Sequence, residues 1–234
     1  MEKLGKNLKE LAADVLEASQ GDLEFAGGSV RVAGTDRAIS LADLSKRPNA
    51  TEERLNASDA FLPPAPTFPN GTHVAEVEID PQTGEVSIVN YIIVDDFGVT
   101  LNPLLLAGQV HGGAVQGIGQ ALMEDTVYDR ESGQLLTASL MDYALPRANG
   151  MPDFIFETRN VPCKNNPLGF KGAGEAGAIG SCPAVINAIA DALWRAYNIA
   201  HIDMPATPAR LWAAVEEGKR ALRDRKSTRL NSSH

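Results

Sequence analysis

Apolar residues in the first part of the chain recur with helical and then with strand periodicity. Their spacing predicts an amphipathic helix over residues 3–19. Short strands are expected around 23–25 and 30–32, joined by a turn at Gly27-Gly28, and a strand that runs into a short helix follows at 39–44. Residues 45–71 contain several prolines and few apolar runs, which predicts a loop. We interpret residues 1–44 as scaffold.

The remaining apolar pattern predicts a mixed α/β (α+β) fold with antiparallel hairpins and buried helices. Further elements carry the strand or helix signals of alternating or 3.6-residue periodicity. They are strands at 72–80 and 86–94 around a turn at 81–84, a helix at 103–123, a hairpin at 126–137, a strand at 154–158, a helix at 184–196 with Ser181 as cap and Pro183 in its first turn, and a last helix after Thr207 with Leu211, Trp212 and Val215 on its inner face.

The helix predicted at 103–123 contains no charged residue. Gln109, Gly113, Gln116 and Gln120 fall within about 60° of one another on a helical wheel, so amides and glycine form one stripe. Five glycines lie between 108 and 119, and each costs about 1 kcal/mol relative to alanine in a helix. Close approach of another backbone or of a ligand would offset that cost. Buried glutamines need hydrogen-bond partners, either neighbouring backbone or the polar edge of a bound heterocycle.

A glycine-rich segment at 171–180 contains a single acid, Glu175, and leads into an apolar helix. Glycines let another molecule lie against the backbone, and backbone N–H groups at a helix start suit an anionic ligand. A carboxylate desolvated in such a place could act as a base. The alternative is that the glycines serve packing and that Glu175 caps the helix. The pattern is not that of a dinucleotide-binding loop.

Three other groups of polar residues are weighed as ligands. Asp95 and Asp96 stand at a predicted strand end, where paired acids are more often turn-forming residues. His111 lies off the amide stripe and is expected to be packed or partly exposed rather than a metal ligand. Lys171 would pair with an anionic ligand or reach solvent, and we favour solvent.

The formal net charge of −9 argues against nucleic acid as a partner. The two cysteines have no metal-ligand spacing and fit a reduced, cytoplasmic setting. No signal peptide is recognised. The stretch 97–123 has no Asp, Glu, Lys or Arg and is long enough to be considered as a membrane span. Its Gly, Gln and Asn content argues instead for a helix buried in protein. Residues 225–234 are polar, basic and aperiodic, so we interpret 219–234 as a non-native tail outside the fold.

Four segments together resemble one family. They are Pro69–Val74 with its hairpin, Gly108–Gly113 continued through Gln116–Gly119, Met141–Ala144 with Pro146-Arg147, and Asn166–Glu175. In order and spacing they resemble the C-terminal part of the molybdenum-cofactor-binding large subunit of the xanthine dehydrogenase and aldehyde oxidase family, nearest to aerobic carbon monoxide dehydrogenase large chains. The resemblance covers residues 4–218.

The resemblance implies roles for particular residues. Glu175 would be the catalytic base, taking a proton from a hydroxyl on molybdenum so that water-derived oxygen is transferred to the substrate. Gln109 would hydrogen-bond the pterin. The metal itself would be held through the pterin dithiolene and by no side chain. The other implied cofactor-binding residues are Gly108, Gly112, Gly113, Gln116, Lys171, Gly172, Ala173 and Gly174.

The resemblance also implies partners and cofactors. The cofactor would be molybdenum–molybdopterin in its cytosine dinucleotide form, with iron–sulfur clusters and FAD on a small and a medium partner subunit, in a dimer of heterotrimers. Such an enzyme is cytoplasmic or attached to the inner face of the membrane. Family large subunits are much longer on the N-terminal side, so we expect a fragment, inactive alone, with its cofactor region at 72–218. The alternatives are a non-catalytic cofactor-binding or assembly module and a phosphate-binding domain.

Overall fold

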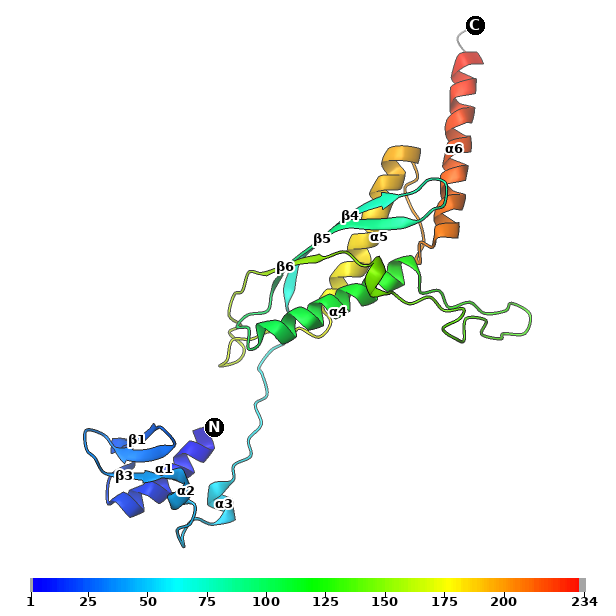
Figure 1. The fold of residues 1–234 in the computed structure, drawn as a ribbon. Coiled ribbons are helices and arrows are strands. Elements are labelled where there is room, and N and C mark those ends of the chain that lie inside the picture. The colour runs from blue at the N-terminus through cyan, green and yellow to red at the C-terminus, as the bar shows by residue number, and fades with distance from the viewer. Residues whose placement is uncertain (1, 232–234) are drawn as a thin grey trace. The chain divides into compact units, whose positions relative to one another are not determined.

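The computed structural model divides the chain into two compact units, Met1–Leu62 and Pro63–His234, and describes residues 2–231 (Figure 1). Residues 232–234 of the predicted tail lie outside the described part. Each unit has its own hydrophobic core. The predicted boundaries at 44 and 71 therefore differ from the division observed, since the first unit also takes in residues 45–62.

The first unit packs one amphipathic helix against a small antiparallel sheet of order β1-β2-β3. Leu11, Leu23, Val30 and Leu44 are fully buried between these layers. The predicted helix, strands and glycine turn are confirmed, and a short helix interrupts the predicted loop. The elements are α1 (Glu2–Leu16), η1 (Gln20–Asp22), β1 (Leu23–Ala26), β2 (Ser29–Val32), β3 (Ala38–Ser40), α2 (Leu41–Leu44) and α3 (Glu52–Leu55).

The second unit is built on a three-stranded sheet of order β4-β5-β6. Strands β4 (Asn70–Ile79) and β5 (Val86–Asp96) form the predicted antiparallel hairpin, whereas β6 (Phe154–Thr158) pairs parallel with β5. The sheet is therefore mixed and not purely antiparallel. A long crossover that contains α4 (Pro103–Leu122) separates β5 from β6, and parallel pairing requires such a connection.

A β-bulge decides which side chains of β5 reach the core. The register shifts between Glu76 and Val77, so that the partner strand has one extra residue. Beyond the bulge, Tyr91 and Ile93 are fully buried and Asp95 is nearly so. Because a one-residue slip moves side chains to the other face of a strand, the bulge brings an ionisable residue, Asp95, to the inner face.

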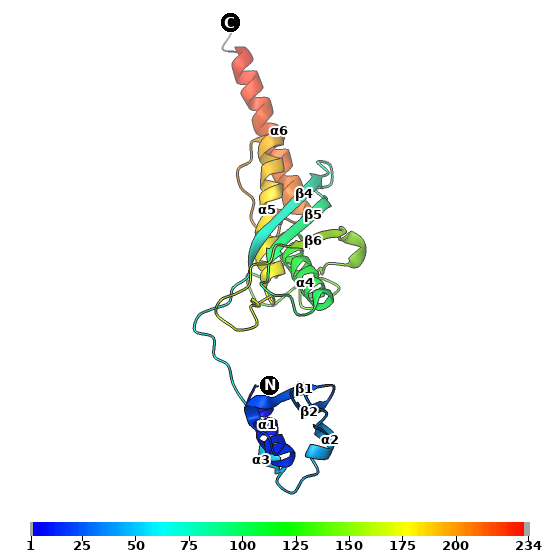
Figure 2. The same ribbon diagram turned by 90° about the vertical axis from the view of Figure 1, so that its left-hand side faces the viewer.

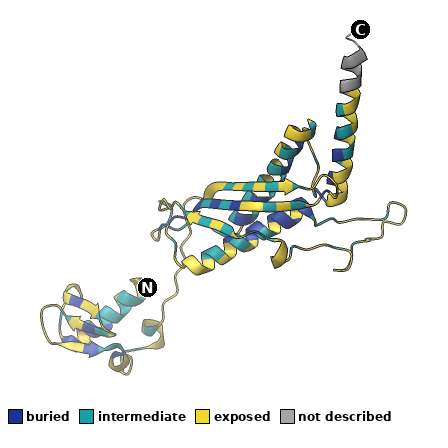
Figure 3. Cartoon of the chain, turned by 45° about the horizontal axis from the view of Figure 1, so that its top comes forward, coloured by how far each residue is buried: buried dark blue, intermediate teal, exposed yellow. Residues whose placement is uncertain are grey.

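Helix α5 (Ala176–Tyr197) packs against β4 and α4, and the buried residues of α4, α5 and the sheet form one core (Figures 2 and 3). The predicted start of this helix is wrong. Helix α5 begins at Ala176, directly after Glu175, so Pro183 lies inside it and Ser181 is fully buried. Glycines of α4 allow its first turns to approach closely, and this tertiary contact outweighs the local proline signal.

The final helix α6 (Pro208–Asn231) begins at the predicted position, with Thr207 Oγ1 accepting the Arg210 N–H at 3.5 Å. Leu211 and Val215 are buried as predicted, but Trp212 is 47% exposed. The helical backbone continues into the segment predicted to be aperiodic. The hairpin predicted at 126–137 reduces to one bridge between Tyr128 and Leu135. A further short element is η2 (Ala148–Gly150).

Among the described residues, α5 is the helix long and apolar enough to meet the length and hydropathy criteria for a membrane span. Its Val185, Ile189 and Leu193 belong to the protein core. Core helices of folded domains meet the same criteria, so the finding carries no further conclusion.

Candidate functional site

The segment that leads to Glu175 is fixed by hydrogen bonds to three distant parts of the second unit. The Lys171 N–H donates to the Phe97 carbonyl at 2.8 Å, and the Gly172 N–H donates to the Thr67 carbonyl at 2.8 Å. The side-chain Nε2 of Gln109 donates to the Gly174 carbonyl at 2.7 Å. The structure therefore brings together two residues predicted independently from the sequence, Gln109 and the glycine directly before Glu175.

Glu175 occupies the N-cap position of α5, with φ −109° and ψ −5°. Its backbone carbonyl accepts the Ile179 N–H at 3.0 Å, but its side chain makes no capping hydrogen bond. The carboxylate is exposed, so the expected desolvation is not provided by this chain. The capping alternative does not describe the observed side chain. A negative charge at the start of a helix is favourable, because it lies near the positive end of the helix dipole.

The amide-bearing face of α4 is exposed, contrary to the expectation of a wholly buried helix. Gln109, Gln116 and Gln120 all face out, and a Cβ atom built at Gly108 or Gly112 would have no neighbour within 4 Å. The Oε1 atom of Gln109 has no hydrogen-bond partner among the described residues. This face therefore offers amide groups beside open space, which is what a flat polar ligand needs.

Gly113 is buried where the edge of this amide stripe meets α5. A Cβ atom there would lie 2.9 Å from Ala178 N and 3.0 Å from Gly177 Cα. Gly117 is tighter still, because its Cβ atom would lie 1.9 Å from Ser181 Oγ. Part of the glycine content of α4 is thus explained by helix–helix contact, one of the two explanations the sequence left open. Gly113 leaves no room for a ligand within this chain.

A hollow of about 350 Å³ adjoins Gln109. This volume is near the lower end of the range of small-molecule sites, about 300–1,000 Å³. Glu175 is not among the residues that line it, although Gln109 links it to the Glu175 segment. The lining residues include Val99, Leu105, Gln109, Phe170, Lys171 and Ala173.

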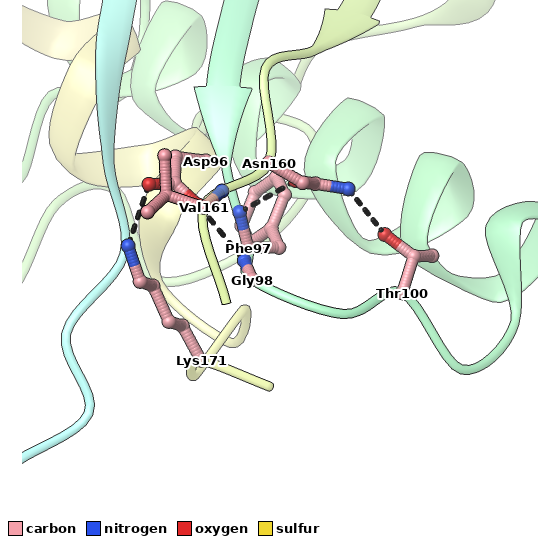
Figure 4. A network of polar contacts seen from close by, with 7 residues as sticks. All are labelled: Asp96, Phe97, Gly98, Thr100, Asn160, Val161 and Lys171. Atoms are coloured by element: carbon pink, nitrogen blue, oxygen red, sulfur yellow. Dashed lines mark hydrogen bonds and ion pairs between the residues drawn. The ribbon is translucent and has the colours of Figure 1, made fainter. Parts of the chain in front are cut away.

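Asp96 and Lys171 form a buried ion pair at the head of the Glu175 segment (Figure 4). Lys171 Nζ lies 2.5 Å from Asp96 Oδ2, and the two side chains are 13% and 10% exposed. The Gly98 and Val161 N–H groups donate to Asp96 Oδ1 at 2.9 and 3.0 Å. The Lys171 ammonium is therefore paired with a carboxylate of the same chain, whereas the two sequence interpretations had it pairing with an external anion or reaching solvent. Asp96 is a turn-forming residue, as favoured.

The electrostatics of Asp96 follow from these contacts. Burial opposes ionisation of the carboxyl group, but hydrogen bonds from Lys171 and from the backbone of Val161 and Gly98 outweigh it, and they lower the pKa of Asp96 to about 2. The adjacent Asn160 extends the network, because its Oδ1 accepts the Phe97 N–H at 3.0 Å and its Nδ2 donates to Thr100 (Figure 4). The carboxylate is therefore charged and held from several sides.

A second polar cluster, which sequence reasoning missed, lies under the first turns of α5. His73 Nδ1 is 3.0 Å from the Tyr91 hydroxyl, and His73 Nε2 is 3.6 Å from Asp95 Oδ2. Burial raises the pKa of Tyr91 well above its usual range. His73, Asp95 and Gly180 line a hollow of about 310 Å³. The bulged register of β4 and β5, which places these side chains on one face, is the signal that could have found the cluster.

The described residues contain no group of three or more His, Cys, Asp and Glu side chains that could hold a metal ion. His111 packs against the rings of Phe154 and Phe156, with centroids 5.3 and 5.9 Å away, which confirms it as a packed histidine.

The exposed face of α4 and the Glu175 segment fit a pterin cofactor that is held by side-chain and backbone contacts and not by a metal ligand. Gln109 offers an acceptor without a partner, and Gly108, Gly112 and Gly174 leave room where side chains would intrude. Ala173 lines the hollow beside Gln109, and the Gly172 N–H is engaged with Thr67. The chain thus supplies one wall of a site that would need other surfaces to close it.

Comparison with known proteins gives a consistent result. The family described as Molybdopterin cofactor-binding domain matches residues 1–152. The chain is 37% identical over 217 residues to 6-hydroxypseudooxynicotine dehydrogenase complex subunit gamma of Paenarthrobacter nicotinovorans, covering 89% of the chain and 27% of that relative. It is 32% identical over 226 residues to the carbon monoxide dehydrogenase large chain of Hydrogenophaga pseudoflava, covering 94% of the chain.

A solved structure shows the same fold. The chain superposes on a crystal structure of Cu,Mo-CO dehydrogenase in its carbon monoxide reduced state with a TM-score of 0.82 and 32% sequence identity, over 93% of the chain and 28% of that structure. The chain thus spans little more than a quarter of the length of each of these three proteins.

Proposed function

The chain belongs to the molybdopterin cofactor-binding domain family of xanthine oxidase and carbon monoxide dehydrogenase type hydroxylases, and we propose that Glu175 is the catalytic base of its enzyme. The whole protein would hydroxylate a small substrate, such as carbon monoxide, an aldehyde or an N-heterocycle, with water-derived oxygen. The single observation that carries the proposal is the 2.7 Å hydrogen bond from Gln109 to the Gly174 carbonyl. It joins the amide face of α4 to the residue beside Glu175.

Gln109 would hold the pterin through its Oε1 atom, while Nε2 keeps the Glu175 segment in place. Gly108, Gly112 and Gly174 would let the ring system approach the backbone closely, and the exposed amide of Gln116 extends the same face. Ala173 would contact the ring edge from the hollow beside Gln109. The bound cofactor supplies the two-electron redox chemistry.

Glu175 would take up the proton released as oxygen is transferred. An exposed carboxylate at a helix start can be aimed at a partner without breaking a hydrogen bond, because its side chain makes none within the helix cap. Closure of the site by the rest of the enzyme would remove water from it. Desolvation would then make the carboxylate a better base.

The proposal extends to the complete assembly. The cofactor would be in its cytosine dinucleotide form, and iron–sulfur and FAD subunits would carry the electrons away, in a cytoplasmic dimer of heterotrimers. The remaining part of the large subunit would cover the open face of α4. Residues 72–218 would be the cofactor region, and the fragment alone would be inactive. These statements rest on membership of the family, since the chain itself spans only 27% and 28% of the two relatives named above.

The test is Glu175→Gln in the complete large subunit reconstituted with its partners. The amide keeps the size of the side chain and removes its ability to accept a proton at neutral pH. Molybdenum content should stay near that of the parent enzyme, and turnover should fall by several orders of magnitude. Unchanged turnover with cofactor retained would remove Glu175 from the mechanism and favour a non-catalytic cofactor-binding module.

A further inference from the structure

We infer that the buried Asp96–Lys171 ion pair positions Glu175, by fixing the start of the glycine-containing segment that carries it. The inference rests on the proposed role of Glu175 for its functional consequence, but its structural part can be tested separately. Asp96 touches no proposed cofactor or substrate site, so it is a positioning residue and acts through Lys171.

Asp96 is a fixed anchor because two backbone groups from separate segments hold one of its oxygens. The Gly98 N–H comes from the turn after β5, and the Val161 N–H comes from the loop after β6. The other oxygen, Oδ2, contacts Lys171 Nζ at 2.5 Å. Charge-assisted hydrogen bonds of this kind are about twice as strong as neutral ones. Lys171 is thereby tied to the end of the sheet (Figure 4).

The segment from Lys171 to Glu175 needs such a tie. Gly172 and Gly174 have no Cβ atom, so this stretch has more backbone freedom to lose than ordinary chain. Hydrogen bonds to Phe97, Thr67 and Gln109 fix single backbone groups along it. At the start of the segment, the Lys171 side chain makes a charged contact with Asp96. At its end, the segment continues directly into α5.

Stability alone does not account for the pair. Two charges buried together cost desolvation free energy, and replacing such a pair with apolar residues is often neutral or stabilising. A geometric role explains why a charged pair stands here.

Asp96→Asn is the selective variant for the test in the 234-residue chain. Its Oδ1 still accepts the Gly98 and Val161 N–H groups, but its Nδ2 cannot accept from Lys171. Hydrogen exchange followed by NMR should show the Gly172 and Ile179 amides exchanging about 10- to 100-fold faster. The matched control is Glu157→Gln, which breaks the exposed Arg159–Glu157 pair on the adjacent strand and should leave both rates unchanged.

Two outcomes would overturn the positioning role. One is unchanged exchange at Gly172 and Ile179 in Asp96→Asn. The other is acceleration by one common factor at all amides of the second unit, which would indicate general destabilisation. If Asp96→Asn does not fold, Lys171→Met provides the same test from the other side, because it keeps the aliphatic stem and the backbone contacts of Asp96.

A double-mutant cycle in the complete enzyme tests the functional consequence. Asp96→Asn should lower kcat with little change in KM or molybdenum content, and it should cause no further loss in the Glu175→Gln background. Equal losses in both backgrounds would show that Asp96 does not act through Glu175. If Glu175→Gln alone is silent, the proposed function fails, and the exchange rates still decide whether the pair positions the segment.

Discussion

The contact between α4 and α5 can be tested with two glycines on the same helix. Gly117→Ala would place a Cβ atom 1.9 Å from Ser181 Oγ and 2.8 Å from Cys182 N. Ser181 is fully buried, and Cys182 N is backbone, so neither can move away cheaply. Gly112→Ala, five residues earlier on the exposed face, meets no atom within 4 Å. It is therefore the matched control.

Both variants gain the helix propensity of alanine, about 1 kcal/mol over glycine. Only Gly117→Ala also incurs overpacking, which costs about 1–3 kcal/mol. Gly112→Ala should thus be more stable than the parent, and Gly117→Ala should be less stable than Gly112→Ala by about 1–3 kcal/mol. For a unit of this size that difference corresponds to roughly 2–4 °C in Tm per kcal/mol.

Tryptophan fluorescence during urea unfolding is the suitable assay, because Trp194 and Trp212, the two tryptophans of the chain, belong to the second unit. The signal then reports only the unit that contains α4. A Gly117→Ala variant as stable as Gly112→Ala would refute the close contact between α4 and α5. Weaker cofactor retention by Gly112→Ala in the complete enzyme, despite higher stability, would separately support the exposed face as a ligand surface.

Three further predictions concern the second unit. The pKa of Asp96 is lowered from 3.8 to about 2 in the folded state. The ionised carboxylate therefore contributes about 2 kcal/mol to the free energy of unfolding above pH 4, and this contribution is lost as pH falls through about 2. Asp96→Asn should remove this part of the acid dependence of the urea midpoint. Pro183→Ala should stabilise the unit by about 1 kcal/mol or more, since proline removes a helix hydrogen bond. Gly180→Ala, also inside a helix, should be less stable than Gly112→Ala by about 1–3 kcal/mol, because its Cβ atom would lie 2.6 Å from the His73 ring.

Each of these predictions has a contradicting result. The same pH dependence in Asp96→Asn and parent would show that the carboxylate is not held as described. A destabilised Pro183→Ala would mean that the proline fits the helix without strain. A Gly180→Ala variant as stable as Gly112→Ala would mean that His73 can turn away from α5. Urea midpoints followed by tryptophan fluorescence measure all three.

Local signals were sufficient to predict most elements. Gly27-Gly28 between short apolar runs predicted the first hairpin, and the alternation on both sides of residues 81–84 predicted the second. Asn102 caps α4 as the Asn-Pro pair indicated, with its Oδ1 accepting the Leu105 N–H at 3.1 Å. These features depend on residues close in the sequence, so a single chain reveals them.

Features that depend on distant contacts were missed. The parallel pairing of β6 requires a long crossover that no short pattern specifies. The early start of α5 depends on glycines of α4, which allow Gly177 to pack against Val110 and Ala114. The Asp96–Lys171 pair joins residues 75 positions apart, and no local sequence signal indicates that the two side chains meet.

The residues of the candidate site were predicted from the sequence, but their solvent exposure was not. Gln109 and the Glu175 segment were both identified from residue type and spacing, and they are hydrogen-bonded across 65 positions. Their exposure was not foreseen, because residue type and spacing do not show which side of a helix start or of a glycine-bearing helix faces solvent. Gly113 was placed with the cofactor because wheel angles alone do not show which face meets a neighbouring helix.

The central claim is that Gln109 holds the cofactor and that Glu175 acts as the catalytic base. The most direct test is to measure activity per bound molybdenum in the complete enzyme. Gln109→Ala should lower the molybdenum bound per subunit while the molecules that retain it keep much of their turnover. Glu175→Gln should show the reverse, with full occupancy and almost no turnover. Loss of activity in proportion to molybdenum in both variants, or in neither, would contradict the account.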